Sequence, residues 1–199
     1  LSGLVNFAIK PRWAFNYLVH EKFSLPQLDD HVDMSGGAVS VGRYFTEMLD
    51  PTMTWDDVCE MIELWDGEFC LKGVMSREDA LRAKEVGATG IVVSNHGGRQ
   101  LDGSRSPFDQ LEEIVDAVGG DIDVIMDSGV QRGSHVLKAL AAGAKAVGGG
   151  RFYLYALAAA GQAGVERALE IMRTEIERNM RLMGVSKISE LNRSHLRYR

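Results

Sequence analysis

The sequence predicts an α/β fold in which parallel strands alternate with helices. Four short apolar runs, each followed by a helical pattern, recur at intervals of roughly 25–30 residues. These runs are apolar throughout rather than alternating, which is typical of strands covered on both faces. Two architectures remain open, an open doubly wound sheet and part of a (β/α)8 barrel. A complete barrel takes about 250 residues, so four units amount to half of one.

Composition excludes several classes of protein. The chain has 199 residues, 45% of them hydrophobic and 25% charged, as expected for a soluble domain with a core. A net charge of −6 without a basic stripe argues against a nucleic-acid surface. Cys59 and Cys70 are interpreted as ordinary thiols of a cytoplasmic protein, because they suit neither a disulfide framework nor a metal site. No apolar run reaches the roughly 18 residues that span a membrane. The chain starts at Leu1 without a signal-peptide pattern, so we expect it to be part of a longer protein.

Residues 1–53 are expected to form a region of their own. An amphipathic helix is predicted near 11–18, followed over 21–53 by an irregular excursion that Pro26, the Gly36-Gly37 pair and Pro51 interrupt. General loop behaviour favours a surface excursion, whereas its length also suits a lid or a peripheral contact.

From residue 54 onward the elements alternate. Thr54 and Ser76 are placed to cap helices, and Gly87 and Gly143 to end them. We predict strands over 69–74, 90–94, 123–127 and 146–151. Helices are predicted over 55–65, 77–86, 107–118 and 133–142, then up to about 160, and finally over 165–183. The tail, 184–199, is expected to be loose.

The stretch Ser94-Asn95-His96-Gly97-Gly98-Arg99 follows the second apolar run directly. It therefore lies at the carboxyl end of a strand, where α/β sheets and barrels bind ligands. The His96 imidazole can take a proton near neutral pH, and the Arg99 guanidinium can grip a carboxylate with two hydrogen bonds. The pair predicts a site that deprotonates a small carboxylic acid derivative.

Polar residues also follow the other three strands. Lys72 lies inside an apolar run, where it needs an anionic partner unless its stem packs and its amine reaches solvent. The glycines before Arg151 let backbone amides approach a phosphate, although they can equally serve close packing. Asp127-Ser128-Gly129 suits either a site or a simple turn.

These motifs together resemble those of the FMN-dependent L-2-hydroxy acid dehydrogenases and oxidases. The matching stretches are Leu71-Lys72-Gly73, residues 94–102 (SNHGGRQLD), Asp127-Ser128-Gly129, Gly150-Arg151 and Tyr155-Ala156-Leu157-Ala158. The resemblance implies that 54–199 is the C-terminal half of a TIM (β/α)8 barrel, with four parallel strands and their helices. Pro11-Arg12-Trp13, residues 49–55 and residues 161–165 look most like the bacterial respiratory lactate and mandelate dehydrogenases.

Carried over residue by residue, the resemblance implies roles for each motif. His96 would be the base, Arg99 would clamp the substrate carboxylate, and Lys72 would lie beside the N1/O2 edge of the flavin. Ser94 would touch the flavin. The ribityl and phosphate site would comprise Asp127, Gly129, Gln131, Gly150 and Arg151. No metal is implied.

The implied reaction oxidises an L-2-hydroxy acid, foremost L-lactate, to the 2-oxo acid, and passes electrons through FMN to a quinone-type acceptor. One alternative is an oxygen-using oxidase like glycolate oxidase. Another is a catalytically silent half-barrel that acts as a fold or assembly unit, and a third is a phosphate-binding barrel of isomerase or synthase type. The expected partners are the hydroxy acid, the acceptor and further copies of the chain, with possible peripheral contact at the inner membrane.

Three departures from the family pattern weigh on these roles. Gln131 stands where the family usually has an arginine near the phosphate, while Arg132 is expected to point elsewhere. Gly149 replaces a bulky aliphatic residue of the last strand, which should weaken the barrel core. The family's N-terminal half, which supplies substrate-contacting tyrosines and an aspartate that pairs with the histidine, is expected to lie outside this sequence. Without that carboxylate His96 is expected to be a poorer base, and the half-barrel has two unpaired sheet edges.

Overall fold

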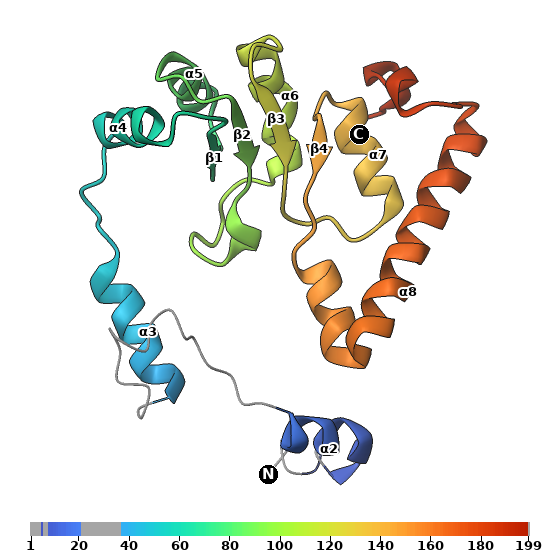
Figure 1. The fold of residues 1–199 in the computed structure, drawn as a ribbon. Helices are drawn as coiled ribbons and strands as arrows, with labels where there is room; N and C mark the ends of the chain where they lie inside the picture. Colours follow the sequence, from blue (N-terminus) through green and yellow to red (C-terminus); the bar gives the residue numbers. More distant parts are fainter. Residues whose placement is uncertain (1–4, 6–7, 21–36, 199) are drawn as a thin grey trace. The chain divides into compact units, whose positions relative to one another are not determined.

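The computed structural model describes residues 5, 8–20 and 37–198, without the side chains of 37–42. The chain divides into two compact units, residues 1–53 and residues 54–199. The sheet and the candidate site both belong to the second unit (Figure 1).

Two helices of the first unit are described. Helix α2, Pro11–Val19, begins with proline at its first turn and matches the predicted helix. Helix α3, Gly37–Met48, falls within the excursion predicted to be irregular, so that prediction is wrong for these residues. Apolar residues at helical spacing, such as Tyr44 and Met48, and the exposed ion pair Arg43–Glu47 at 2.6 Å support a helix there. Residues 21–36 of the predicted excursion lie outside the described residues.

The second unit is built on four parallel strands in the order β1-β2-β3-β4. Their bounds are Cys70–Lys72 (β1), Gly90–Val93 (β2), Asp123–Met126 (β3) and Ala146–Val147 (β4). The predicted α/β class with four parallel strands is confirmed. The last strand is shorter than predicted, because Gly148 to Gly150 leave it after one further backbone bond, from Gly148 N to Met126 O at 2.8 Å.

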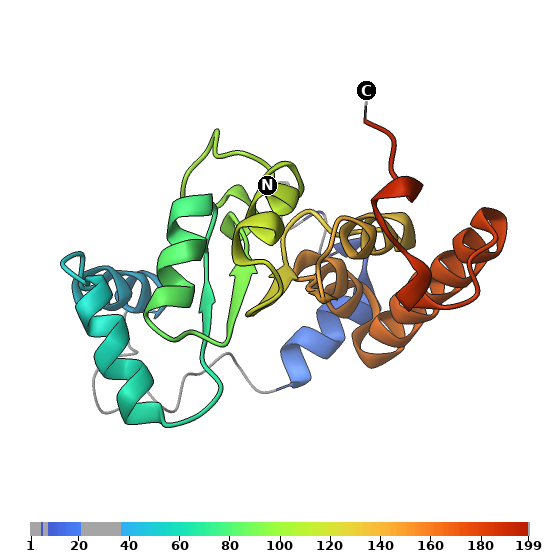
Figure 2. The ribbon, with the colours of Figure 1, turned by 90° about the horizontal axis from the view of Figure 1, so that it is seen from above.

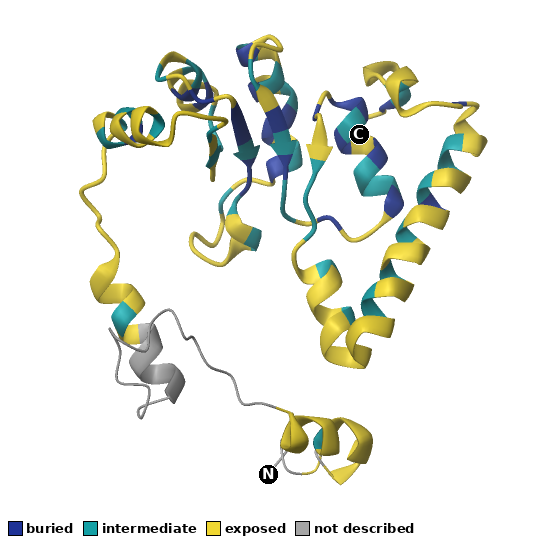
Figure 3. Cartoon of the chain, viewed as in Figure 1, coloured by how far each residue is buried: buried dark blue, intermediate teal, exposed yellow. Residues whose placement is uncertain are grey.

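Helices α5 (Arg77–Glu85), α6 (Pro107–Val118) and α7 (Gly133–Ala141) pack on one face of this sheet. Ser76 caps α5 as predicted, its Oγ accepting from the Asp79 amide at 3.0 Å. The core lies between these helices and the sheet, where Ile91, Val93 and Leu111 are fully buried (Figure 3). Helix α4, Trp55–Trp65, adds Val58, Trp55 and Ile62 to the buried apolar surface.

Within the second unit, the described residues do not cover the opposite face of the sheet. Side chains in register across it are exposed at Lys72 and Ala146 and half-buried at Val92 and Ile125. The expectation that both faces are covered therefore holds for one face only. Strands that are apolar on an open face are suited to a further layer, as in a closed barrel.

Helix α8, Arg151–Met183, contains the two helices predicted there. They are separated at Ala160 and at Gly161, whose φ of 59° lies in the left-handed region that favours glycine. Figures 1 and 2 show the chain turning sharply at this point. A Cβ at the nearby Gly164 would overlap the Ala156 carbonyl oxygen, so the two helical segments can approach this closely only at a glycine.

The C-terminal tail is docked rather than loose, so that prediction is wrong. It forms the 3-10 turns Ile188–Glu190 and Arg193–His195, and it buries Leu196. Arg193 Nη2 pairs with Asp116 Oδ1 of α6 at 2.7 Å, and the Tyr198 hydroxyl donates to Glu112 Oε1 at 2.6 Å. The partners lie on a helix about eighty residues earlier, which no local pattern reveals. Among the described residues no helix combines the length and apolarity needed to cross a membrane.

Candidate active site

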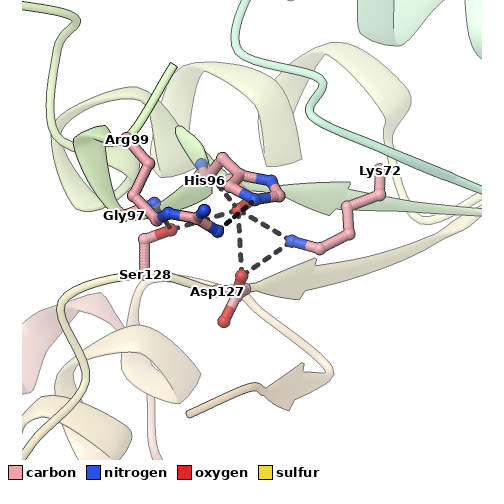
Figure 4. Close-up of polar contacts among 7 residues, drawn as sticks. Lys72, His96, Gly97, Arg99, Asp127 and Ser128 are labelled. Carbon is pink, nitrogen blue, oxygen red and sulfur yellow. Dashed lines mark hydrogen bonds and ion pairs between the residues drawn. The ribbon is translucent and has the colours of Figure 1, made fainter. Parts of the chain in front are cut away.

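Three polar side chains meet at the carboxyl ends of β1, β2 and β3 (Figure 4). Lys72 Nζ lies 2.8 Å from Asp127 Oδ2 and 3.0 Å from Ser94 Oγ, and Ser94 Oγ lies 2.9 Å from the same Asp127 oxygen. Parallel strands end at the same edge of a sheet, which is why residues 55 positions apart meet here. The lysine thus has the anionic partner that its position requires, while its side chain stays 51% exposed at the rim.

The carboxyl of Asp127 is held ionised by this arrangement. Partial burial on its own raises the pKa of the Asp127 carboxyl. Hydrogen bonds from Lys72, Ser94 and the Ser128 amide outweigh the burial and leave that pKa below its ordinary value. The site therefore contains a fixed negative charge that orients the Lys72 ammonium.

The loop after β2 carries His96 and folds back on the strand ends. It forms a short 3-10 turn, His96–Gly98, in which His96, Gly97 and Gly98 have φ values of 54°, 67° and 70°. The His96 amide donates to Ser94 Oγ at 3.1 Å, and the Gly97 amide donates to Ser128 Oγ at 3.0 Å. Hydroxyls at the ends of β2 and β3 thus hold this left-handed turn.

His96 and Arg99 face each other across the loop (Figure 4). Arg99 Nη1 lies 3.3 Å from His96 Nε2, and both residues are exposed. A guanidinium can only donate, so the imidazole nitrogen accepts with its lone pair. Within residues 54–198 no carboxylate is hydrogen-bonded to the His96 ring. The base and the carboxylate clamp predicted from the sequence therefore lie together, without the acidic partner that the family resemblance would supply.

At the expected phosphate end of the site, Arg151 lies against the loop that carries His96. Arg151 Nη2 donates to the Gly97 carbonyl at 2.5 Å, which ties the start of α8 to the His96 loop. A Cβ at Gly97 would lie 2.5 Å from that same nitrogen, so the contact requires glycine. The Gln131 side chain takes no part in this network, although the Gln131 amide donates to His135 Nδ1 at 3.3 Å.

Arg132 points away from the strand ends, as the sequence predicts. Its guanidinium pairs with Glu175 Oε1 at 2.6 Å, and Glu175 Oε2 accepts from the Gly133 amide at 2.8 Å. These two donors hold the pKa of the Glu175 carboxyl below its usual range, against a smaller opposing effect of burial. Arg132 and Glu175 therefore join α7 to α8 and serve the packing of the helices.

Sequence reasoning missed one residue of the network. Ser128 contacts both Ser94 and the Gly97 amide, yet Asp127-Ser128-Gly129 suited a simple turn equally well. A hydroxyl residue between an aspartate and a glycine directly after a strand is the available signal.

The chain matches the family described as FMN-dependent dehydrogenase over residues 1–198. It is 45% identical to the L-lactate dehydrogenase (cytochrome) of Saccharomyces cerevisiae, over 81% of this chain and 28% of that protein. It is 46% identical to the L-lactate oxidase of a Nostoc species, over 80% of this chain and 44% of that protein.

Solved structures give the same result. A flavocytochrome b2 variant with sulfite bound has a TM-score of 0.71 at 46% identity, covering 73% of this chain and 39% of that one. A mandelate oxidase with benzoyl-formic acid has a TM-score of 0.67 at 46% identity, covering 71% and 42%. The chain thus spans less than half the length of these relatives.

Proposed function

Because the chain belongs to the family of FMN-dependent dehydrogenases, we propose that its protein oxidises an L-2-hydroxy acid to the 2-oxo acid. L-Lactate is the proposed substrate, since relatives named for lactate share 45–46% of their aligned residues with this chain. The observation that carries the proposal is the convergence of Lys72, His96 and Arg99 on one edge of the sheet.

The residues at this edge suit FMN. Lys72 offers an exposed ammonium held by Asp127, as a flavin ring that gains negative charge on reduction requires. At the start of α8, Gly150 has open space around it and precedes helix amides without intrahelical partners, which suits a phosphate. When bound, FMN supplies the acceptor for two electrons. We assign Lys72, Ser94, Asp127, Gly129, Gly150 and Arg151 to its site, with Gln131 at the edge of the phosphate.

The substrate acid binds through its carboxylate to Arg99. In the structure Arg99 donates to His96 Nε2, so a carboxylate that draws the guanidinium toward itself frees the imidazole lone pair. His96 Nε2 then accepts a proton from the substrate, while Arg99 neutralises the carboxylate next to the reacting carbon. Binding of the substrate thereby frees His96 Nε2 from Arg99 to act as the base.

For the electron acceptor and the location we keep the proposal of a quinone-type acceptor and peripheral contact with the cytoplasmic side of the inner membrane. The likeness of Pro11-Arg12-Trp13 and residues 49–55 to the bacterial respiratory dehydrogenases supports it. Oxygen is the alternative acceptor, since one relative carries the name L-lactate oxidase.

A second candidate function is that of a silent half-barrel. It is favoured by the phosphate end, where Arg132 is engaged by Glu175, Arg151 by Gly97, and glutamine occupies position 131. Such a chain would serve as a fold or assembly unit without flavin.

Titration of the purified chain with FMN separates the two. The enzyme proposal expects flavin absorbance to remain with the protein after gel filtration, and L-lactate to bleach it under anaerobic conditions. If the protein carries no flavin absorbance after gel filtration from millimolar FMN, the enzyme proposal for this chain is refuted and the silent unit is favoured.

A further inference from the structure

Ser128 follows β3 in a backbone conformation that L-residues rarely adopt. Its φ is 87°, in the left-handed region where a non-glycine residue is strained. Strain of this kind persists only where surrounding contacts overdetermine the conformation, and it is concentrated at functional sites. The serine side chain therefore has to be accounted for by its contacts.

Those contacts all lead to the loop that carries His96. Ser128 Oγ accepts from the Gly97 amide at 3.0 Å and lies 3.1 Å from Ser94 Oγ. Ser94 Oγ in turn accepts from the His96 amide at 3.1 Å. The two amides flanking the left-handed turn at His96 thus end on two hydroxyls that touch each other.

The turn needs this support because its own geometry is unfavourable. His96, with φ of 54°, is a second strained non-glycine residue, and the loop around it is exposed to solvent. Ser94 is buried at the end of β2, so its hydroxyl has a fixed position. Ser128 Oγ contacts this hydroxyl and accepts from the Gly97 amide, which connects Gly97 to the end of β2. Without Ser128 Oγ the Gly97 amide would lose its only hydrogen-bond acceptor among the described residues.

We propose that Ser128 is a positioning residue, whose hydroxyl holds the His96–Gly98 turn so that His96 Nε2 and Arg99 are presented together. This proposal rests on the proposed function for its catalytic meaning, but not for its structural part. The matched variants are Ser128→Ala, which removes the hydroxyl and keeps a strained Cβ, and Ser128→Gly, which removes the hydroxyl and relieves the strain. Ser106→Ala is the control, because that exposed serine makes no side-chain cap on α6.

Amide hydrogen exchange of the FMN-free chain, read by NMR, tests the positioning without turnover. We expect the Gly97 amide to exchange about tenfold faster in both Ser128 variants and unchanged in Ser106→Ala, since one net hydrogen bond is lost. Ser128→Gly should unfold at a temperature equal to or above that of Ser128→Ala, because glycine is unstrained at this φ. Faster Gly97 exchange in both variants would then reflect loss of the hydroxyl and not loss of global stability. Gly97 exchange that is equally slow in all variants, or already unprotected in the parent, overturns the proposal.

Kinetics of the flavin-loaded protein test the catalytic part. Both Ser128 variants should lower kcat/KM for L-lactate about tenfold while the affinity for FMN stays unchanged. Loss of FMN affinity in parallel would make Ser128 a cofactor contact and overturn the positioning role. Absence of turnover in the parent would count against the proposed function, while the exchange experiment would still decide the role of Ser128.

Discussion

At the scale of single residues, the oxygens of Asp127 and Ser94 position the two groups expected to act on flavin and substrate, Lys72 and His96. Asp127 Oδ2 accepts from both Lys72 and Ser94, and Ser94 Oγ also accepts from the His96 amide. The ammonium and the imidazole are therefore located relative to one another through a buried serine. This is how groups on separate strands acquire a common geometry.

Replacement of His96 tests its role as the base. In the flavin-loaded protein, His96→Gln should lower kcat by about 10²–10⁴-fold, the usual contribution of a general base, and leave flavin bound. The measurement is anaerobic flavin reduction by L-lactate, with bound flavin quantified in the same samples. If the variant lost flavin instead, His96 would be a structural residue.

The lowered pKa of Asp127 predicts how the stability of the fold depends on pH. Because its pKa is below the ordinary value when folded, the stability it contributes is complete above the unfolded pKa, near 4, and is lost as the pH falls through the folded pKa. Asp127→Asn should therefore be less stable at neutral pH and lose less stability on acidification. Urea unfolding at a series of pH values measures both, and an unchanged acid slope would contradict the assignment.

At the scale of elements, the contact between α7 and α8 leaves no room for a side chain at Gly133. A Cβ at Gly133 would lie 2.7 Å from both Glu175 Cβ and the Ile176 amide nitrogen. The start of α7 approaches α8 this closely because the Gly133 amide donates to Glu175. Overpacking at such a contact cannot be relieved by a flexible side chain, since backbone lies opposite.

Gly133→Ala should accordingly destabilise the chain by about 1–3 kcal/mol, as overpacking commonly does. Gly149→Ala is the matched control, because a Cβ there would meet Phe152 Cβ and Val130 O at 3.8 and 3.9 Å, ordinary contact distances. The control should change stability by no more than about 0.5 kcal/mol. Chemical denaturation of the two variants measures the difference, and equal midpoints would refute the packing argument.

The two elements that the sequence predicted wrongly were missed for different reasons. The sequence did not predict helix α3 because Gly37 and Gly42 interrupt its pattern, although its apolar spacing is helical. The C-terminal tail has no periodic pattern, and it is ordered by Arg193 and Leu196 finding partners on distant parts of the chain. Local pattern identifies elements that are stabilised locally, and it fails for the tail, where several long-range contacts supply the order.

At the scale of the whole sheet-bearing unit, residues 54–199, one face of the sheet and two strand edges remain open. Lys72 and Ala146 are exposed on that face, and no described strand pairs with the outer edges of β1 and β4. Flanking helices add exposed apolar residues, among them Leu64 and Trp65 on α4 and Tyr155 on α8. Open edges and apolar surface of this kind drive association.

The 199-residue chain on its own should therefore form dimers or larger assemblies. Multi-angle light scattering at several concentrations measures this, and a stable monomer across the range would contradict it. A separately expressed N-terminal half-barrel of a full-length relative serves as the competitor. If it covers the same face, it should reduce the self-association.

The sequence by itself determined the class of fold, the order of its strands and helices, and the chemistry collected at the strand ends. Those properties are carried by local periodicity, by capping residues and by motifs such as residues 94–102. Only the tertiary structure decided which partners each group takes: Lys72 with Asp127, Arg132 with Glu175, Arg151 with Gly97, and Ser128 with the His96 turn. These pairs join residues 31 to 55 positions apart. Strand register, left-handed loop conformations and the packing of α7 on α8 bring them together. All three depend on tertiary packing rather than on a local pattern alone.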